Sequence, residues 1–170
     1  MDPHSAATES IVSLTPSELV GLREELIAVA AEAFSAPPWN EGPDDAAGLV
    51  DGMLGKVERR DFTAVAAFDD GRLAGFAYGH TGSTTAGLHP GPLAPAEAFE
   101  VIELAVATAY QGRGIGRMLH NALIAHAPSP RMLLTHHEAP ARGAYARWGW
   151  TEVASVTTLS GHERVLMQKA

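Results

Sequence analysis

The spacing of apolar residues changes along the chain between a helical period and a strand period, and this predicts the order of its elements. Apolar residues recur every three or four positions over residues 16–36 and again over residues 43–58, which predicts two helices. Thr15 and Glu18 have the spacing of a capping box before the first helix. Pro37 sets its end, because a residue that precedes proline avoids helical dihedrals.

Short apolar runs of strand length occupy most of the remaining chain. The predicted strands are residues 11–14, 62–68, 72–80, 100–106, 132–135, 151–159 and 164–168. The residues Asp69, Asp70 and Gly71 read as a hairpin turn between the second and third strands. A last helix is expected over residues 139–148, and Gly149 is its expected left-handed stop.

The strand at 100–106 is the expected centre of the sheet. Its residues Ile102, Leu104 and Val106 are predicted to share one face, with Glu103 on the opposite face. The apolar positions that follow, at Ile115 and beyond, repeat with helical spacing. The chain therefore runs from a strand through a short turn into a helix.

That turn contains three glycines, at positions 112, 114 and 116, in the run Gln-Gly-Arg-Gly-Ile-Gly. Glycine has no Cβ, so an anion can approach the main chain closely. The first amides of the helix are unpaired, and together these features predict a binding site for phosphate oxygens. No Walker sequence occurs, and the third glycine of a dinucleotide fingerprint would fall at Arg117.

A strand ending in Leu-Ala-Val followed by this glycine turn closely resembles the pyrophosphate loop of the GNAT superfamily, the acyl-CoA-dependent N-acetyltransferases. The predicted order β-α-α-β-β-β-α-β-α-β-β also matches the GNAT fold. The resemblance is most specific over residues 100–150 and weak before residue 60. It implies an α/β fold, with one mixed central sheet flanked by helices, over residues 10–170. Residues 1–9 are expected to form a flexible tail.

The resemblance implies that acetyl-CoA is the co-substrate. Main-chain amides of the glycine turn would hold its pyrophosphate, two arginines would add positive charge, and the central strand would pair with the pantetheine arm. The implied donor-binding residues are Leu104, Ala105, Val106, Gln111, Gly112, Arg113, Gly114, Ile115, Gly116 and Arg117. For the two arginines, the alternative is ordinary solvated side chains.

Tyr145 matches the tyrosine that the family uses as general acid for the leaving thiolate; the alternative is a helix tyrosine packed on the sheet. The usual family asparagine is replaced here by Ala139. A base is also needed, because most of an alkylamine is protonated at neutral pH. Glu103 is the first candidate, because an acid in mid-strand of a buried sheet is unusual. Pairing with an arginine such as Arg131 is the alternative for Glu103.

The other candidates for the base are Glu100, then His80 and the pair His136 and His137.

Two segments are candidates for the acceptor site. Trp39 either forms a wall of that site or closes the core under its loop. The Gly- and Pro-rich residues 81–98 read as a mobile loop near the acceptor, with disorder as the alternative. Glu100, next to this loop, is therefore also a candidate substrate-binding residue.

Composition narrows the function classes. A net charge of −8 argues against nucleic acid as a partner and is compatible with a cationic amine. The absence of cysteine excludes disulfides and thiolate metal sites, and the histidines lack zinc-ligand spacing, so no metal is expected. His120 is expected on the outer face of its helix. No membrane span or signal peptide is evident, which predicts a cytoplasmic protein, as a monomer or homodimer.

The expected function is transfer of an acetyl group from acetyl-CoA to a primary amine of a small molecule or peptide, by direct attack in a ternary complex. Two alternatives stay open. One is a non-catalytic acyl-CoA-binding module that keeps the glycine turn but has no base. The other is an enzyme of the same fold that uses a longer acyl-CoA.

Overall fold

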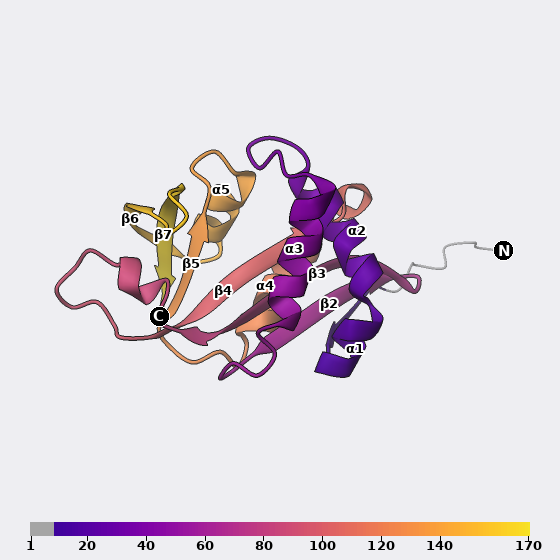
Figure 1. Ribbon diagram of the computed structural model, residues 1–170, viewed down its shortest axis with the longest axis horizontal. Helices are drawn as coiled ribbons and strands as arrows, with labels where there is room; N and C mark the ends of the chain where they lie inside the picture. The colour runs from indigo at the N-terminus through magenta and orange to yellow at the C-terminus, as the bar shows by residue number, and fades with distance from the viewer. Residues whose placement is uncertain (1–8) are drawn as a thin grey trace.

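A seven-stranded mixed sheet organises the residues that the computed structural model describes, 9–170 (Figure 1). Its strand order is β1-β2-β3-β4-β5-β7-β6. The strands are β1 Glu9–Ser13, β2 Thr63–Asp69, β3 Arg72–Gly82, β4 Ala98–Val106, β5 Arg131–Thr135, β6 Thr151–Thr157 and β7 Glu163–Lys169. All neighbours are antiparallel except β4 and β5, which are parallel. Residues 1–8, most of the expected tail, lie outside this part, and Glu9 opens β1.

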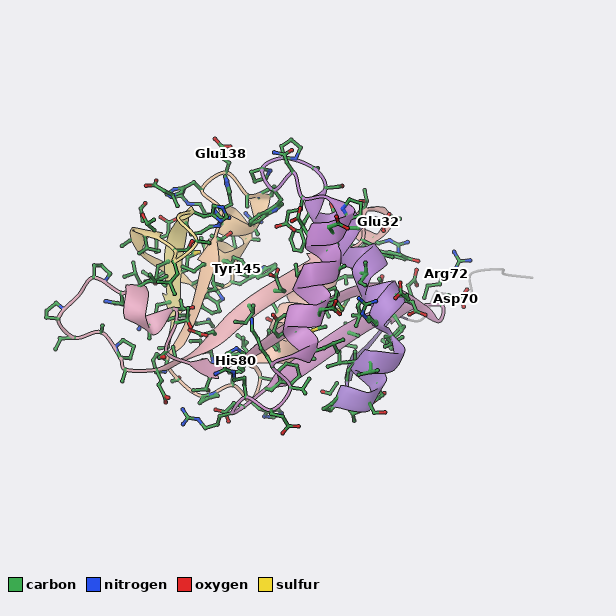
Figure 2. The ribbon with its side chains drawn as sticks, in the orientation of Figure 1. Glu32, Asp70, Arg72, His80, Glu138 and Tyr145 are labelled. Carbon is green, nitrogen blue, oxygen red and sulfur yellow. The ribbon has the colours of Figure 1, made fainter. Side chains whose placement is uncertain are left out.

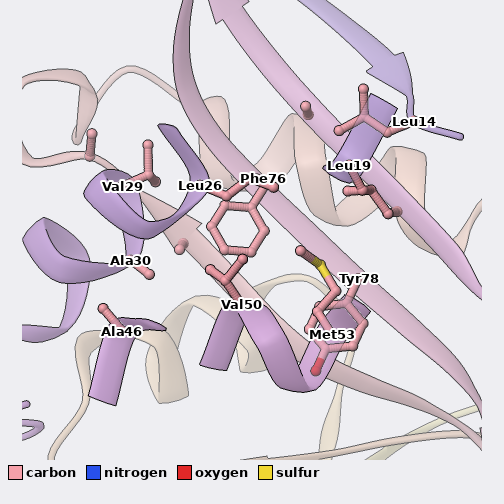
Figure 3. Packing of buried hydrophobic residues seen from close by; sticks show 14 of the residues in the cluster. Leu14, Leu19, Leu26, Val29, Ala30, Ala46, Val50, Met53, Phe76 and Tyr78 are labelled. Carbon is pink, nitrogen blue, oxygen red and sulfur yellow. The ribbon is translucent and has the colours of Figure 1, made fainter. Parts of the chain in front are cut away.

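Helices cover both faces of the sheet, as the sequence predicts (Figure 1). They are α1 Pro16–Gly21, α2 Arg23–Phe34, α3 Pro43–Leu54, α4 Ile115–Ile124 and α5 Pro140–Arg147, with short 3-10 turns η1 Ala86–Leu88 and η2 Thr108–Tyr110. One core cluster joins α1–α3 to strands β2–β4 and includes Leu26, Val50 and Phe76 (Figure 3). A second cluster, with Leu119 and Phe99, lies on the α4 face. No helix in residues 9–170 is long and apolar enough to cross a bilayer.

The two predicted N-terminal helices differ from the observed ones. The capping box of Thr15 and Glu18 is present, but the first helix divides at Leu22, which has φ −100° and ψ 10°. Gly21, directly before this break, has a low helix propensity. The second helix ends at Leu54, because Gly55 caps it there, and residues 55–58 form turns instead. The β2–β3 hairpin turns through Asp70 and Gly71, both at positive φ, as predicted.

A β-bulge changes the expected faces of the central strand. Tyr78 pairs with Glu103 and Gly79 with Val101, so Ile102 is an extra residue in β4. Ile102 therefore packs with the α1–α3 core, whereas Leu104 packs on the α4 side. The prediction that these two residues share one face was wrong, because the bulge interrupts the two-residue period.

The bulge also lies where β4 and β5 separate. Their parallel pairing covers Phe99–Val101 and ends at the pair Val101 and Leu133. The remainder of β4 continues without a partner on that side. This edge of the strand therefore opens beside the end of β5.

Residues 81–98 differ from the expected structureless loop. β3 continues to Gly82, and Thr85 and Ala86 are buried at the η1 turn. Ala86 packs with Met132 and Leu166, so the segment covers one face of β5 and β7. It lines none of the three cavities that Glu103 lines, so its expected position near the acceptor stays a prediction.

Candidate active site

The glycine turn presents a row of main-chain N–H groups at the start of α4. Gly112 and Gly114 have φ 78° and 81°, and a Cβ at either position would meet no atom within 4 Å. The N–H groups of residues 112–117 make no hydrogen bond to any residue in the described chain. Gln111 supports the turn, because its Nε2 donates to the Val106 carbonyl at 3.0 Å. The arrangement provides unpaired donors at a helix N-terminus, which is a favourable site for an anion.

The two arginines of this turn differ in their surroundings. Arg113 lies 3.4 Å from the buried Asp69 carboxylate and 5.5 Å from the centre of the Tyr110 ring. Arg117 is exposed, and no carboxylate of residues 9–170 forms an ion pair with it. Arg113 thus has a protein partner that competes for its charge, while Arg117 does not.

A cavity of about 390 Å³, the central cavity, occupies the opening between β4 and β5. Residues of β4, β5, α5, the turn before α4 and the α2–α3 connection line it. Among them are Leu104, Val106 and Gln111 of the predicted donor site. The cavity therefore connects the unpaired strand edge with the region of the glycine turn.

Tyr145 projects from α5 into the central cavity (Figure 2). It is 7% exposed, and its hydroxyl makes no hydrogen bond with any described residue. The pKa of the Tyr145 phenol is raised above its ordinary value, mainly by burial and to a smaller extent by the charge of Glu103. The hydroxyl consequently keeps its proton and can donate it inside the cavity.

Glu103 lies where three cavities meet. Together with Ile102 it lines the central cavity and two others on the α2–α3 side. Protein atoms surround the carboxyl, although the cavities leave part of the residue accessible. Burial first, and then Glu41, raise the pKa of Glu103 to about 8, and Lys56 opposes this shift. No ion pair to Arg131 forms; that side chain donates to the Ala127 and Ala170 carbonyls instead.

The second cavity, about 420 Å³, is called the acidic cavity because Glu41, Asp44, Asp45 and Glu103 line it, together with Lys56 and Tyr78. The third, about 280 Å³, is called the hairpin cavity because the β6–β7 hairpin forms one side of it. No sequence pattern distinguishes Glu41, Asp44 or Tyr78 as site residues. Acidic residues near a helix start are common, and a tyrosine in a strand is ordinary.

Trp39 separates the central and hairpin cavities, because it lines both. Its ring packs edge-on against Phe34 at 5.6 Å and His136 at 5.5 Å between centroids, and Arg164 lies 5.8 Å above it. Trp39 is half-buried and also packs on the α1–α3 core. Both sequence interpretations of this residue, a wall of the site and a core contact, are therefore compatible with its position.

The remaining candidates for base or substrate binding do not line the three cavities. Glu100 is buried, accepts a hydrogen bond from the Thr85 amide and faces the η1 segment. His80, its cross-strand neighbour, is bonded through Nδ1 to the Thr81 carbonyl at 3.0 Å. Neither of them, nor His136 and His137, lines any of the three cavities. Within residues 9–170, no group of three or more His, Cys, Asp or Glu could hold a metal ion.

His120 was predicted on the outer helix face, and that prediction was wrong. The residue is 1% exposed, and its Nε2 accepts a hydrogen bond from the Trp150 indole at 2.8 Å. Tyr145 and Trp148 also pack around the imidazole. Burial lowers the pKa of His120, so the neutral ring is favoured. These contacts connect α4 with α5 and so help to position Tyr145.

The chain belongs to the acetyltransferase (GNAT) family, whose model matches residues 23–150. It is therefore an acyltransferase, of a family that binds coenzyme A. No curated protein sequence is significantly similar to the chain.

Several solved structures share this fold. PH1933 from Pyrococcus horikoshii OT3 superposes with a TM-score of 0.72 at 18% identity, over 95% of this chain and 98% of that one. The aminoglycoside 6'-acetyltransferase type Ii gives 0.66 at 22% identity, over 95% and 96%. The PaiA N-acetyltransferase from Thermoplasma acidophilum, a complex with coenzyme A, gives 0.65 at 17% identity, over 95% and 98%. At these identities the similarity shows the fold alone.

Proposed function

We propose that this enzyme transfers an acetyl group from acetyl-CoA to a primary amine of a small molecule or peptide, by direct attack while both substrates are bound. One observation carries the proposal. Glu103 and Tyr145, from β4 and α5, line the same central cavity, which reaches Gln111 at the start of the glycine turn. A candidate base and a candidate acid thus lie at one cavity, next to the turn proposed to bind the diphosphate.

The residues fit coenzyme A. The unpaired amides of residues 112–117 offer donors for a diphosphate, and the glycines leave room for it to approach. The β4 edge beyond Val101 has no strand partner on the β5 side, so a pantetheine arm has main-chain groups to pair with. When bound, acetyl-CoA supplies the thioester whose acetyl group is transferred.

The protein's own groups would handle the protons. Glu103 takes a proton from the acceptor ammonium, which makes the nitrogen nucleophilic. The Tyr145 hydroxyl gives its proton to the departing sulfur, and its raised pKa keeps that proton available. A glutamate with a pKa of about 8 is well matched to a base at mildly alkaline pH.

The alternative of a non-catalytic acyl-CoA-binding module has less support. Such a module needs the glycine turn but has no use for a carboxyl surrounded by protein atoms and an unpaired phenol at the same cavity. A longer acyl donor is the other alternative, and competition between acetyl-CoA and longer acyl-CoA thioesters would decide it. Two structural neighbours, the aminoglycoside 6'-acetyltransferase type Ii and the ribosomal-protein-S18-alanine N-acetyltransferase from Escherichia coli, are named for unlike acceptors. Their names therefore do not indicate the acceptor of this chain.

The direct test is Glu103→Gln in a thiol-release assay with acetyl-CoA and primary amines. Because the folded-state pKa of Glu103 lies near 8, turnover of the wild type should rise with pH through about that value. The variant should lose roughly 100-fold in turnover at high pH, together with this inflection. Retention of both rate and inflection would remove Glu103 as the base.

Protein stability provides an independent readout of the same pKa. The carboxyl holds an extra proton in the folded state between its ordinary value of 4.5 and about 8, so stability falls as pH rises across that window. Glu103→Gln should remove this slope and stabilise the protein above pH 8 by about 1–3 kcal/mol. Denaturant unfolding at several pH values measures it.

A further inference from the structure

The acidic cavity carries negative charge that neither the fold nor the proton transfer requires. Asp45 has a structural task, because its Oδ2 accepts from the Gly42 amide at 2.7 Å at the start of α3. The carboxylates of Glu41 and Asp44 make no hydrogen bond or ion pair with any described residue. Burial, and then the charge of Asp45, raise the pKa of Glu41, and Arg164, which lines the hairpin cavity with Glu41, opposes this shift. The surplus points to a positively charged occupant.

A buried hydroxyl is a second, independent sign of a ligand. Tyr78 is only 2% exposed and packs with core residues such as Met53 and Val50, yet it also lines the acidic cavity (Figure 3). Its hydroxyl has no hydrogen-bond partner in residues 9–170. The hydroxyl oxygen is not fully enclosed by protein atoms, so a ligand in the cavity can reach it. Buried phenols normally have a partner, so this oxygen is available to accept from a donor in the cavity.

Lys56 shows where a cation is stabilised. Its Nζ lies 5.9 Å from the centre of the Tyr78 ring, within the range of a cation–π contact. It is the one basic residue among those lining the acidic cavity. A flexible lysine side chain can move aside for a ligand of the same charge.

We propose that the acidic cavity binds the second, non-reacting ammonium of a diamine acceptor, whose other amine reacts at Glu103. The proposal rests on the function proposed above. Ile102 and Glu103 line both the acidic and the central cavity, so one extended molecule can reach from one to the other. Glu41, Asp44 and the Tyr78 hydroxyl would bind the second ammonium.

Charge predicts the order of preference among acceptors. The second ammonium of a diamine compensates the negative charge of the carboxylates in the acidic cavity, whereas an alkyl monoamine of equal length leaves that charge uncompensated. An amino acid of equal length places its own carboxylate there, and the cavity carboxylates repel it. Like charges placed side by side in such a site are costly, whereas a charge-assisted hydrogen bond stabilises. The diamine should be the best acceptor and the amino acid the poorest.

The test measures kcat and KM with a series of α,ω-diamines of increasing length, matched monoalkylamines and matched ω-amino acids. The best diamine should exceed its monoamine roughly tenfold or more in kcat/KM. Glu41→Gln should reduce that ratio about fivefold, mainly through the diamine KM. Glu138→Gln makes the same change on an exposed loop that lines none of the three cavities, and it should leave the ratio unchanged (Figure 2).

Calorimetry separates this inference from the proposed function. The diamine is titrated into the protein with coenzyme A present, where no acetyl transfer takes place. Diamine binding that weakens in Glu41→Gln supports the inference even if no acetylation is ever observed. An active enzyme with equal kcat/KM for diamine and monoamine overturns the inference and leaves the proposed function standing. Absence of diamine binding also overturns it.

Discussion

The two ends of the candidate active site are built in different ways. At the glycine turn, the proposed binding groups are main-chain N–H groups of consecutive residues, and three of the six residues 112–117 have no side chain. At the proposed acceptor end, the groups are side chains from separate elements, namely Tyr78 of β3, Glu103 of β4 and Glu41 of the α2–α3 connection. The first end is a local feature of the chain, and the second exists only when distant segments pack together.

This difference predicts how each end responds to mutation. A main-chain site is disturbed by added bulk or charge, while removal of a neighbouring side chain has little effect. A side-chain site responds to the loss of one group, because that group supplies the interaction. Variants at the two ends should therefore separate donor binding, chemistry and acceptor binding.

The largest effect is expected from Gly116→Glu. A Cβ at Gly116 would lie 3.7 Å from Leu104 and 3.9 Å from Val106, which is ordinary contact, so the fold should persist. The added carboxylate would repel a diphosphate and lower coenzyme A affinity by roughly 100-fold or more. Calorimetric titration measures this, with Gly116→Ala as the matched control. Gly114→Asp is less clean, because Gly114 has φ 81°. Unchanged affinity in folded Gly116→Glu would place the donor elsewhere.

Tyr145→Phe is expected to affect chemistry rather than binding. Loss of the phenol proton should lower turnover by roughly 100-fold, with donor affinity changed less than threefold. The ring and its contacts with His120 and Trp148 are retained, so stability is a suitable control. Pre-steady-state thiol release, which isolates the chemical step, is the measurement. A rate equal to that of the wild type would leave Tyr145 with a packing role only.

Trp39→Ala should act on the acceptor alone. The indole separates the central and hairpin cavities, so its removal should raise the acceptor KM about tenfold while the donor Kd stays the same. Because Trp39 also packs on Phe34, thermal unfolding must be followed in parallel. Trp39→Phe should restore most of the affinity. If donor binding fell as much as acceptor binding, the division between the two ends would not hold.

The smallest change among these four variants is expected from Arg113→Ala. Its guanidinium already contacts Asp69, so coenzyme A affinity should fall threefold or less, whereas stability should fall by about 1 kcal/mol because a buried carboxylate loses its partner. Arg117→Ala is the comparison, since that side chain is exposed and without a carboxylate partner in the described chain. A large loss from Arg113→Ala would show that side-chain charge, and not the main chain, dominates this end.

Most of the fold could be predicted from local patterns. The strand–turn–helix at 98–124, the capping box at Thr15 and the left-handed Gly149 each depend on neighbouring residues, and all three are present. Predictions failed where distant contacts decide. The bulge at Ile102 depends on pairing with β3, and the burial of His120 depends on Trp150, thirty positions away along the chain.

The amino-acid sequence alone was sufficient to determine the family and the glycine turn, because a run of glycines after an apolar strand specifies both conformation and accessible amides within a few residues. Only the tertiary structure decided which acids lie near Glu103 and that Tyr145 lines the same cavity as Glu103. It also decided that the buried Tyr78 phenol lines the acidic cavity together with Glu41 and Asp44. Proximity, burial and charge coupling are properties of side chains brought together from separate elements, and no local pattern encodes them.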